Sequence, residues 1–229
     1  MSLTATTATT ANGFNAETTY QRLREQIVGS ERMPNERLVE VDLANDFSVS
    51  RTVVRTVLTR LEQEGLVVRE PNRGARVRMV TEAEAVEILQ ARCALETLAA
   101  FHAALNATPE DIEELRKIMD EASGLLGRGN LLNYSDCNAR LHDKIVEVSG
   151  HKIAGSLISG LRAQLVRFQF KTILVPGRDV HAFAEHSAVV DAIADKDPER
   201  AERAMKAHMG HITEAIGKTD LARNQRSSP

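Results

Sequence analysis

Three histidines and one asparagine in the C-terminal half of the chain have the types and spacing of metal ligands. Asn138 and His142 are four residues apart in a helical pattern, so both side chains lie on one face of the helix. His186 and His208 each lie in the middle of a later helical pattern. Three imidazoles and an oxygen donor suit a borderline divalent metal such as Zn²⁺, with Ni²⁺ and Mn²⁺ as alternatives. This interpretation requires a bundle that brings the helices together, because a single histidine in a helix is more often structural.

Two of the four ligands have a neighbouring residue that could replace them. Asp136 would be the more usual ligand, but it lies about 240° round the helix from His142, which favours Asn138. His211 follows His208 by three residues and could share its side of the helix. Spacing alone does not choose between these two histidines.

Arg92 and Glu96 form a further pair, four residues apart in a helix whose inner side is mostly Ala, Leu and Ile. One interpretation is a structural ion pair. The other is a guanidinium that binds the carboxylate of a ligand through two parallel hydrogen bonds inside a bundle.

The stretch from Glu36 to Leu66 carries a second candidate site. Two helical patterns meet at residues 47–49, and the second begins after a good N-cap, Ser50. One face of the second helix is apolar and is formed by Val54, Val57, Leu58 and Leu61. The neighbouring face is polar and is formed by Arg51, Thr52, Arg55 and Thr59. A recognition helix in a DNA major groove has this geometry, although an ordinary solvated face is the alternative.

The segment after Leu66 favours DNA binding. Two short alternating runs, 66–69 and 75–80, flank a turn that contains Pro, Asn and Gly, which predicts a β-hairpin. Together with a helix over 17–28, it completes a winged helix-turn-helix over residues 16–80. Arg73 and Gly74 would lie at the tip of the wing, where contact with phosphate or the minor groove is expected.

The distribution of charge agrees with a small DNA-binding module. Residues 47–80 hold seven Arg against three Glu, a balance of +4, whereas residues 81–229 hold 18 Lys and Arg against 22 Asp and Glu, a balance of -4. With 3% aromatic residues and no Trp, stacking on single-stranded nucleic acid is disfavoured.

From Thr81 onward the pattern is helical only, which predicts an antiparallel helical bundle over residues 81–218 and a mainly α chain. The expected helices cover approximately residues 81–105, 109–127, 130–148, 151–174, 178–195 and 198–216. Residues 1–15 and 219–229 are expected to be disordered or frayed tails. No apolar run is long enough to span a bilayer, and no secretory signal is evident. Two cysteines, Cys93 and Cys137, are expected to pack as small hydrophobic side chains and indicate a reducing cytoplasm.

Over residues 16–218 the chain resembles the GntR family of bacterial transcription regulators, in the branch with a helical FCD effector domain. The resemblance is carried by PNERLVEVDLANDFSVSRTVVRTVLTRLEQEGLV and NRGARV in the first half. In the second half it is carried by RCALETLAA, NARLHDKIVEVSG and EHSAVVDAIADKDPERAERAMKAHM.

The resemblance implies roles for particular residues. It implies that Arg51, Thr52 and Arg55 contact the operator, with Arg73 and Gly74 at the wing. The residues that match the family's metal ligands are Asn138, His142, His186 and His208. Arg92 matches the family's arginine that faces a carboxylate effector.

The chain also departs from the family pattern. Asn138 replaces the more usual Asp, and a neutral amide should hold a metal less strongly. Ser48 replaces a Gly in the turn, so a residue with a Cβ must adopt a backbone conformation that glycine adopts more readily. Val41 replaces a basic residue, so one DNA contact is expected to be missing. His151 replaces an Asn and has no evident function.

The sequence therefore predicts a homodimeric repressor that a small organic acid releases from a palindromic operator. The alternative is a metal-dependent hydrolase or isomerase fused to a DNA-binding module. Its candidate base would be Glu185, but this residue is adjacent to His186 and points about 100° away from it. In a third hypothesis the histidines bind the effector directly, without a metal.

Overall fold

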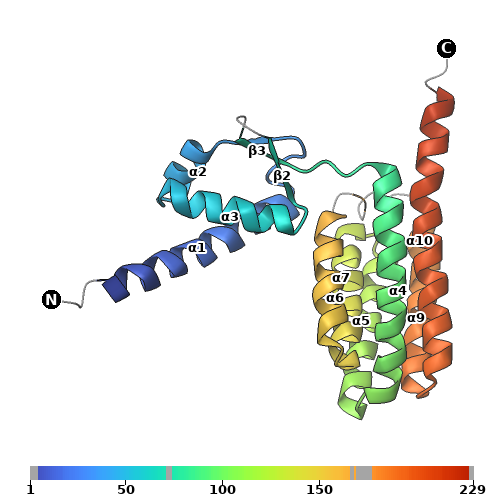
Figure 1. Cartoon of the computed structure of the whole chain (residues 1–229). Helices are drawn as coiled ribbons and strands as arrows, with labels where there is room; N and C mark the ends of the chain where they lie inside the picture. Colours follow the sequence, from blue (N-terminus) through green and yellow to red (C-terminus); the bar gives the residue numbers. More distant parts are fainter. Residues whose placement is uncertain (1–4, 71–73, 166–167, 169–176, 227–229) are drawn as a thin grey trace. The chain divides into compact units, whose positions relative to one another are not determined.

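The chain folds into two compact units, Met1–Val80 and Thr81–Pro229, as shown by a computed structural model (Figure 1). It describes the backbone of residues 5–70, 74–165, 168 and 177–226. Among these residues, no helix is both long enough and apolar enough to cross a bilayer. The predicted mainly α fold, a winged helix-turn-helix followed by a helical bundle, is confirmed.

The N-terminal unit has the order of elements of a winged helix. They are α1 (Ala5–Val28), β1 (Arg37–Leu38), α2 (Glu40–Asp46), α3 (Arg51–Gln63), β2 (Val67–Glu70) and β3 (Gly74–Val77). The strands pair antiparallel in the order β1-β3-β2. The sequence did not predict β1, because two residues are too short to show an alternating pattern.

The turn between α2 and α3 has the strain that its sequence indicates. Ser48 adopts φ +53°, the left-handed region that glycine occupies more readily. The next helix starts as predicted, because the side chain of Ser50 accepts a hydrogen bond from the backbone N–H of Val53. The turn that precedes α3 is therefore strained, whereas the cap is regular.

Helix α3 is held against α1 by both apolar and polar contacts. The predicted apolar stripe is buried, and Val53 is buried with it. At the end of α3, the Arg60 guanidinium lies 3.5 Å from the centroid of the Tyr20 ring. The Tyr20 hydroxyl donates to Glu64. These contacts fix α3 while its polar face remains exposed.

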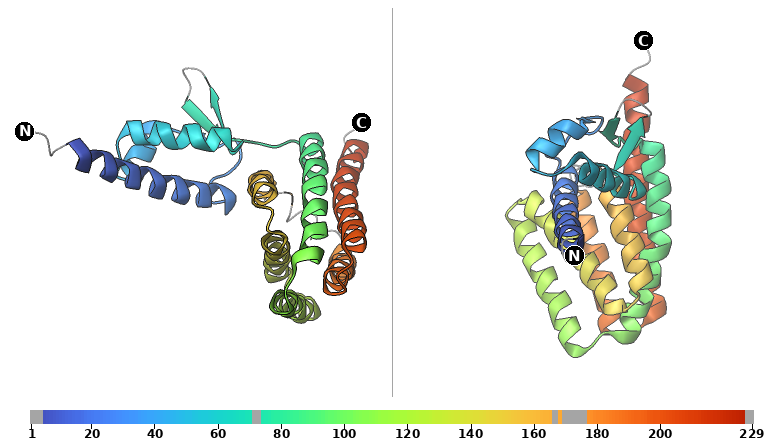
Figure 2. Two further views of the ribbon diagram at one scale, coloured as in Figure 1. Left: turned by 60° about the horizontal axis from the view of Figure 1, so that its bottom comes forward. Right: turned by 60° about the vertical axis from the view of Figure 1, so that its left-hand side comes forward.

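The C-terminal unit is a helical bundle (Figure 2). Its described helices are α4 (Glu82–Asn106), α5 (Pro109–Gly127), α6 (Leu131–Ser149), α7 (Lys152–Gln164), α9 (Arg178–Ala194) and α10 (Pro198–Arg226). Helix α4 packs against α6, α7, α9 and α10. Three of these helices begin at N-caps, where side-chain oxygens of Thr81, Thr108 and Asp197 accept backbone N–H groups.

Several helix bounds differ from expectation. Helix α1 begins at Ala5, inside the segment expected to be disordered, and α10 continues to Arg226, across the expected C-terminal tail. Extension adds one hydrogen bond per residue once a packed helix exists, so weak local propensity does not stop it. Helix α7 ends at Gln164, and most of the remaining predicted helix, to residue 174, falls outside the described residues.

Candidate functional site

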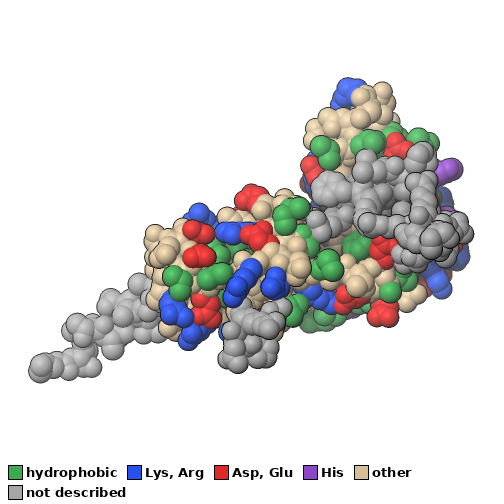
Figure 3. Space-filling model, turned by 90° about the horizontal axis from the view of Figure 1, so that it is seen from above, with side chains coloured by type: hydrophobic (Ala, Val, Ile, Leu, Met, Phe, Trp, Pro, Cys, Tyr) green, Lys and Arg blue, Asp and Glu red, His purple; other side chains and the backbone are tan. Residues whose placement is uncertain are grey.

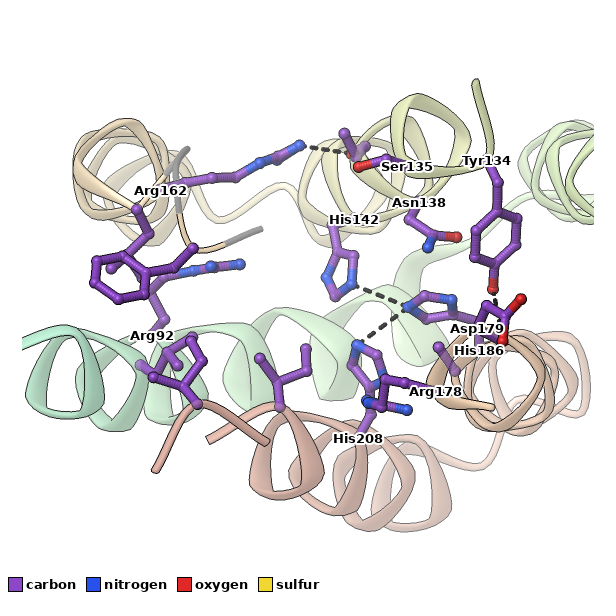
Figure 4. Close-up of a pocket in the computed structure, with 17 residues that line it drawn as sticks. Arg92, Tyr134, Ser135, Asn138, His142, Arg162, Arg178, Asp179, His186 and His208 are labelled. Carbon is purple, nitrogen blue, oxygen red and sulfur yellow. Dashed lines mark hydrogen bonds between the residues drawn. The ribbon is translucent and has the colours of Figure 1, made fainter. Parts of the chain in front are cut away.

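The bundle brings His142 of α6, His186 of α9 and His208 of α10 together (Figure 4). The Nε2 atom of His186 lies 3.2 Å from that of His142 and 3.1 Å from that of His208. All three side chains are buried, and His186 and His208 are each 2% exposed. Three imidazole nitrogens therefore converge on one point in the interior of the bundle.

Two carboxylates fix the orientation of the outer histidines. The Nδ1–H of His142 donates to Glu96, and the Nδ1–H of His208 donates to Oε2 of Glu185 at 2.7 Å. A neutral imidazole with its proton on Nδ1 has a free lone pair on Nε2. Both Nε2 lone pairs are therefore available to a cation at the point of convergence. This is the usual arrangement of histidines that bind metals.

The environment keeps His186 and His208 in the neutral form that binds metal. Burial, together with the neighbouring His208, lowers the pKa of His186 well below its ordinary value. Burial also lowers the pKa of His208 to about 4, although its hydrogen bond to Glu185 opposes this shift. Nδ1 of His186 is buried and has no hydrogen-bond partner among the described residues. The donor set therefore fits a divalent cation.

The two carboxylates are anionic despite their burial. Burial would raise the pKa of Glu96, but the charge of Arg92 holds it well below its usual range. Burial would likewise raise the pKa of Glu185, but hydrogen bonds from His208 and Arg178 lower it to about 2. Each carboxylate is thus matched by an arginine, as a buried charge requires.

A cavity of about 100 Å³ adjoins the histidines. Asn138 lines it, and in Figure 4 its side chain lies between Tyr134 and the histidines. The Tyr134 hydroxyl donates to the backbone oxygen of Asp179 at 3.0 Å. The three histidines also line the cavity, so all four predicted ligands lie at one site.

Among the described residues, three arginines line the same cavity, and each has a carboxylate partner. Arg92 donates to Glu96 through Nε at 3.0 Å and also through Nη2. It therefore forms the structural ion pair, and it also lines the cavity. Arg162 pairs with Asp143, and Arg178 pairs with Glu185.

His211 lies apart from the three buried histidines. Its side chain is 56% exposed, and its Nδ1 bonds to Oε1 of Glu185 at 2.8 Å. The buried member of this pair is His208. The open alternative in the sequence is resolved in favour of His208 as the histidine at the cavity.

Sequence reasoning missed the orienting role of two carboxylates. The helical offset of Glu185 from His186 correctly separates these two side chains, but it does not reveal that Glu185 faces His208 on α10. The spacing of Glu96 indicates a pair with Arg92 and does not reveal its contact with His142. His151 has a structural function, because its Nδ1 accepts the backbone N–H of Ala154 and caps α7.

The second candidate site is the exposed face of α3. Arg51, Thr52 and Arg55 are all exposed there. Glu40 of α2 accepts from Arg55 Nε at 2.8 Å and from Arg51 Nη2 at 3.5 Å. Val41, next to Glu40, is exposed.

The wing provides less detail than α3. Gly74 begins β3 with φ +87°, which favours glycine, whereas Arg73 lies outside the described residues. In Figure 3 the N-terminal unit shows basic and acidic side chains interspersed, without one continuous basic surface.

A winged helix-turn-helix joined to a helical domain with a histidine-lined cavity defines a ligand-responsive transcription regulator. Residues 15–77 match the family described as bacterial regulatory proteins, gntR family, and residues 87–211 match the FCD domain. The chain belongs to the GntR family, in its FCD branch.

Named relatives and solved structures agree with this assignment. The chain is 24% identical over 197 residues to the HTH-type transcriptional repressor RspR of Escherichia coli strain K12, covering 86% of each protein. It is 28% identical over 224 residues to the repressor NanR of Salmonella newport, covering 85% of this chain and 82% of NanR. The structure of E. coli McbR/YncC has the same fold, with a TM-score of 0.74 and 21% identity, covering 90% of this chain and 98% of that one.

Proposed function

We propose that the protein is a cytoplasmic repressor that a small organic acid releases from its operator. The observation that carries this proposal is the convergence of three imidazoles on a cavity whose described wall also contains three arginines. Cationic and metal-binding groups around a small cavity favour an anionic ligand. The relatives RspR and NanR are both named as repressors, which supports repression.

A divalent metal would be held by His142, His186 and His208, with the side-chain oxygen of Asn138 as the fourth protein donor. Zn²⁺ suits this set, and Ni²⁺ or Mn²⁺ are the alternatives. The bound metal would supply a positive centre that attracts a carboxylate. Glu96 and Glu185 hold the outer imidazoles with Nε2 facing the cation, and Arg92 faces the effector.

The DNA-binding surface would consist of Arg51, Thr52 and Arg55 on α3, with Arg73 and Gly74 on the wing. Arginine side chains near the start of a recognition helix reach base edges and phosphates in the major groove. A twofold dimer would read two half-sites related by the same symmetry.

The surface for dimerisation would lie on α4 and α7. These helices pack together and expose four large apolar side chains, which are Leu98, Leu105, Ile153 and Leu157. Burial of such a surface against a second copy removes apolar area from water. The substitution pair Ile153→Ser and Leu157→Ser should convert the dimer to a monomer in light-scattering measurements. A dimer that persists in this variant would place the interface elsewhere.

Effector binding would favour one arrangement of the dimer over another. A ligand shifts such an equilibrium only by the difference between its affinities for the two states. In the released state the two recognition helices would no longer match the half-sites together.

The enzyme alternative is not favoured. Both oxygens of its candidate base, Glu185, accept hydrogen bonds, from His208 and Arg178 on one oxygen and from His211 on the other. A carboxylate held in this way orients its partners and is poorly placed to accept a proton from a substrate.

The proposal is tested in three measurements on the full chain. Footprinting should show a protected palindrome that is lost in the double variant Arg51→Ala, Arg55→Ala, whereas unchanged protection would refute the DNA surface. Protein purified without chelator should contain about one metal ion per chain, and its absence even after reconstitution would leave only direct binding of effector by the histidines. A thermal-shift screen of carboxylic acids on metal-loaded protein should then identify effectors that release the operator.

A further inference from the structure

Arg178, the first residue of α9, has a buried nitrogen without a hydrogen-bond partner in the described part of the chain. Its Nη2 donates to Oε2 of Glu185 at 2.9 Å. Its Nη1 is buried and makes no hydrogen bond with the described residues. The side chain is 11% exposed and lines the cavity beside the histidines. A charged donor in the interior of the bundle is therefore left without an acceptor from the residues that the structure describes.

This situation is unusual enough to indicate a ligand. Buried guanidinium nitrogens are normally matched by acceptors, and a buried donor that lacks one weakens the fold. A carboxylate oxygen is the acceptor that a guanidinium binds most strongly. An acidic ligand in the cavity would satisfy Nη1 without breaking the existing bond from Nη2 to Glu185.

Arg178 also has a counterpart on the other side of the histidines. Arg92 binds Glu96, which binds His142, and Arg178 binds Glu185, which binds His208. In Figure 4, Arg178 lies next to His208, whereas Arg92 approaches from the side of His142. The cavity is therefore flanked by two guanidiniums that come from different helices.

The size and charge of the cavity limit what could bridge these groups. A cavity of about 100 Å³ suits a compact ligand. Asp179 is the acidic residue among the described residues that line the cavity, against three arginines that each pair with a further carboxylate. A compact anion that accepts a hydrogen bond from Arg178 Nη1 matches both the size and the unused donor.

We propose that Arg178 selects effectors with two carboxylates, so that the cavity binds a dicarboxylate in preference to a monocarboxylate of equal length. One carboxylate binds at the histidines and Arg92, and the other supplies the acceptor that Arg178 Nη1 lacks. This inference rests on the proposed function and names the class of its effector.

The test compares succinate with butyrate, two four-carbon acids that differ only in whether the second end is a carboxylate or a methyl group. Calorimetry on the Zn²⁺-loaded full chain should show that succinate binds at least about tenfold more tightly, as one added charge-assisted hydrogen bond predicts. In Arg178→Lys, which keeps the charge beside Glu185 but loses the planar fork, the preference should fall to about twofold or less. The matched control is Arg140→Lys, which alters an exposed ion pair with Glu121 and should keep the wild-type preference.

Metal content is measured in every variant, so that a loss of selectivity is separated from a loss of the metal site. Equal affinity of the wild-type protein for both acids overturns the proposal, and this comparison depends on no variant. An unchanged preference in metal-loaded Arg178→Lys overturns it as well. If butyrate releases the operator as well as succinate does, this proposal fails while the proposed function stands. If no carboxylic acid binds at all, the effector part of the proposed function fails with it.

Discussion

Oε2 of Glu185 accepts hydrogen bonds from both His208 and Arg178, at 2.7 Å and 2.9 Å. One carboxylate oxygen therefore connects a histidine at the metal-binding position with an arginine at the ligand cavity. Because this oxygen fixes the tautomer of His208, a change in its charge should alter the affinity of the histidines for a metal.

Glu185→Gln should weaken metal binding by about 10- to 100-fold, the usual effect of losing a group that orients a ligand. The amide still accepts one hydrogen bond but carries no charge to oppose the cation. Competition with a chromogenic chelator measures the affinity, and operator binding by the metal-free protein should not change. Glu113→Gln, which alters an exposed ion pair with Lys117, is the control. Wild-type metal affinity in Glu185→Gln would show that the carboxylate has no such function.

Sequence periodicity could predict the histidine site, but not the groups behind it. A helical wheel shows which residues share a face, and this placed Asn138 with His142 correctly. The wheel does not show which neighbouring helix that face meets. The 100° offset of Glu185 from His186 therefore does not reveal that Glu185 meets His208 on α10.

The same distinction separates the predicted and unpredicted parts of the fold. The apolar stripe of α3 and the Ser50 cap depend on short-range spacing, and both are present. Strand β1 has two residues and exists only because β3 offers it a partner. The pairing of Glu40 with Arg51 and Arg55 likewise depends on how α2 meets α3. These contacts join different helices and strands. They depend on how the elements pack together, which the residue pattern of one helix or strand does not predict.

Acid should destabilise the metal-free protein in a defined range of pH. The pKa of His208 is about 4 in the folded chain, against 6.5 for an unperturbed histidine. Between these values the unfolded chain binds a proton that the folded chain does not, so stability rises with pH and is complete above about pH 6.5. His186, whose pKa is also lowered, acts in the same direction.

Thermal denaturation in the presence of chelator checks this dependence. The Tm should change little above pH 7 and should fall steadily as the pH decreases from about 6.5 to 4. Glu185, with a pKa of about 2, stabilises the fold above its ordinary value of 4.5 and loses this effect only at lower pH. His208→Asn should flatten the slope between pH 6.5 and 4. A Tm that rises on acidification through this range would contradict the assignment.

Ser48→Gly should stabilise the N-terminal unit. Ser48 has φ +53°, a conformation that costs a residue with a Cβ about 1–2 kcal/mol. Glycine avoids this cost, but its greater conformational freedom in the unfolded chain offsets about 0.5–1 kcal/mol of the gain. The expected net gain is about 0.5–1 kcal/mol in the free energy of unfolding, measured by urea denaturation. Ser123→Gly is the matched control, because Ser123 is exposed within α5 and glycine there should lower the stability. A loss of stability in Ser48→Gly would mean that the serine side chain stabilises the turn.

Glu40→Gln should make DNA binding tighter but less specific. Burial would raise the pKa of Glu40, but its hydrogen bond from Arg55 and the neighbouring Arg51 lower it, so the carboxylate is anionic at neutral pH. It holds both arginines of the recognition face and repels phosphate. Removal of this charge should raise the affinity for random DNA several-fold at low salt, and should lower the ratio of operator binding to random binding, because the released arginines are less ordered.

Titrations of both DNAs over a range of salt concentrations measure this ratio. Glu62→Gln removes one exposed charge from the far end of α3 and controls for net charge alone; an equal gain in that variant would show that contact with the two arginines is irrelevant.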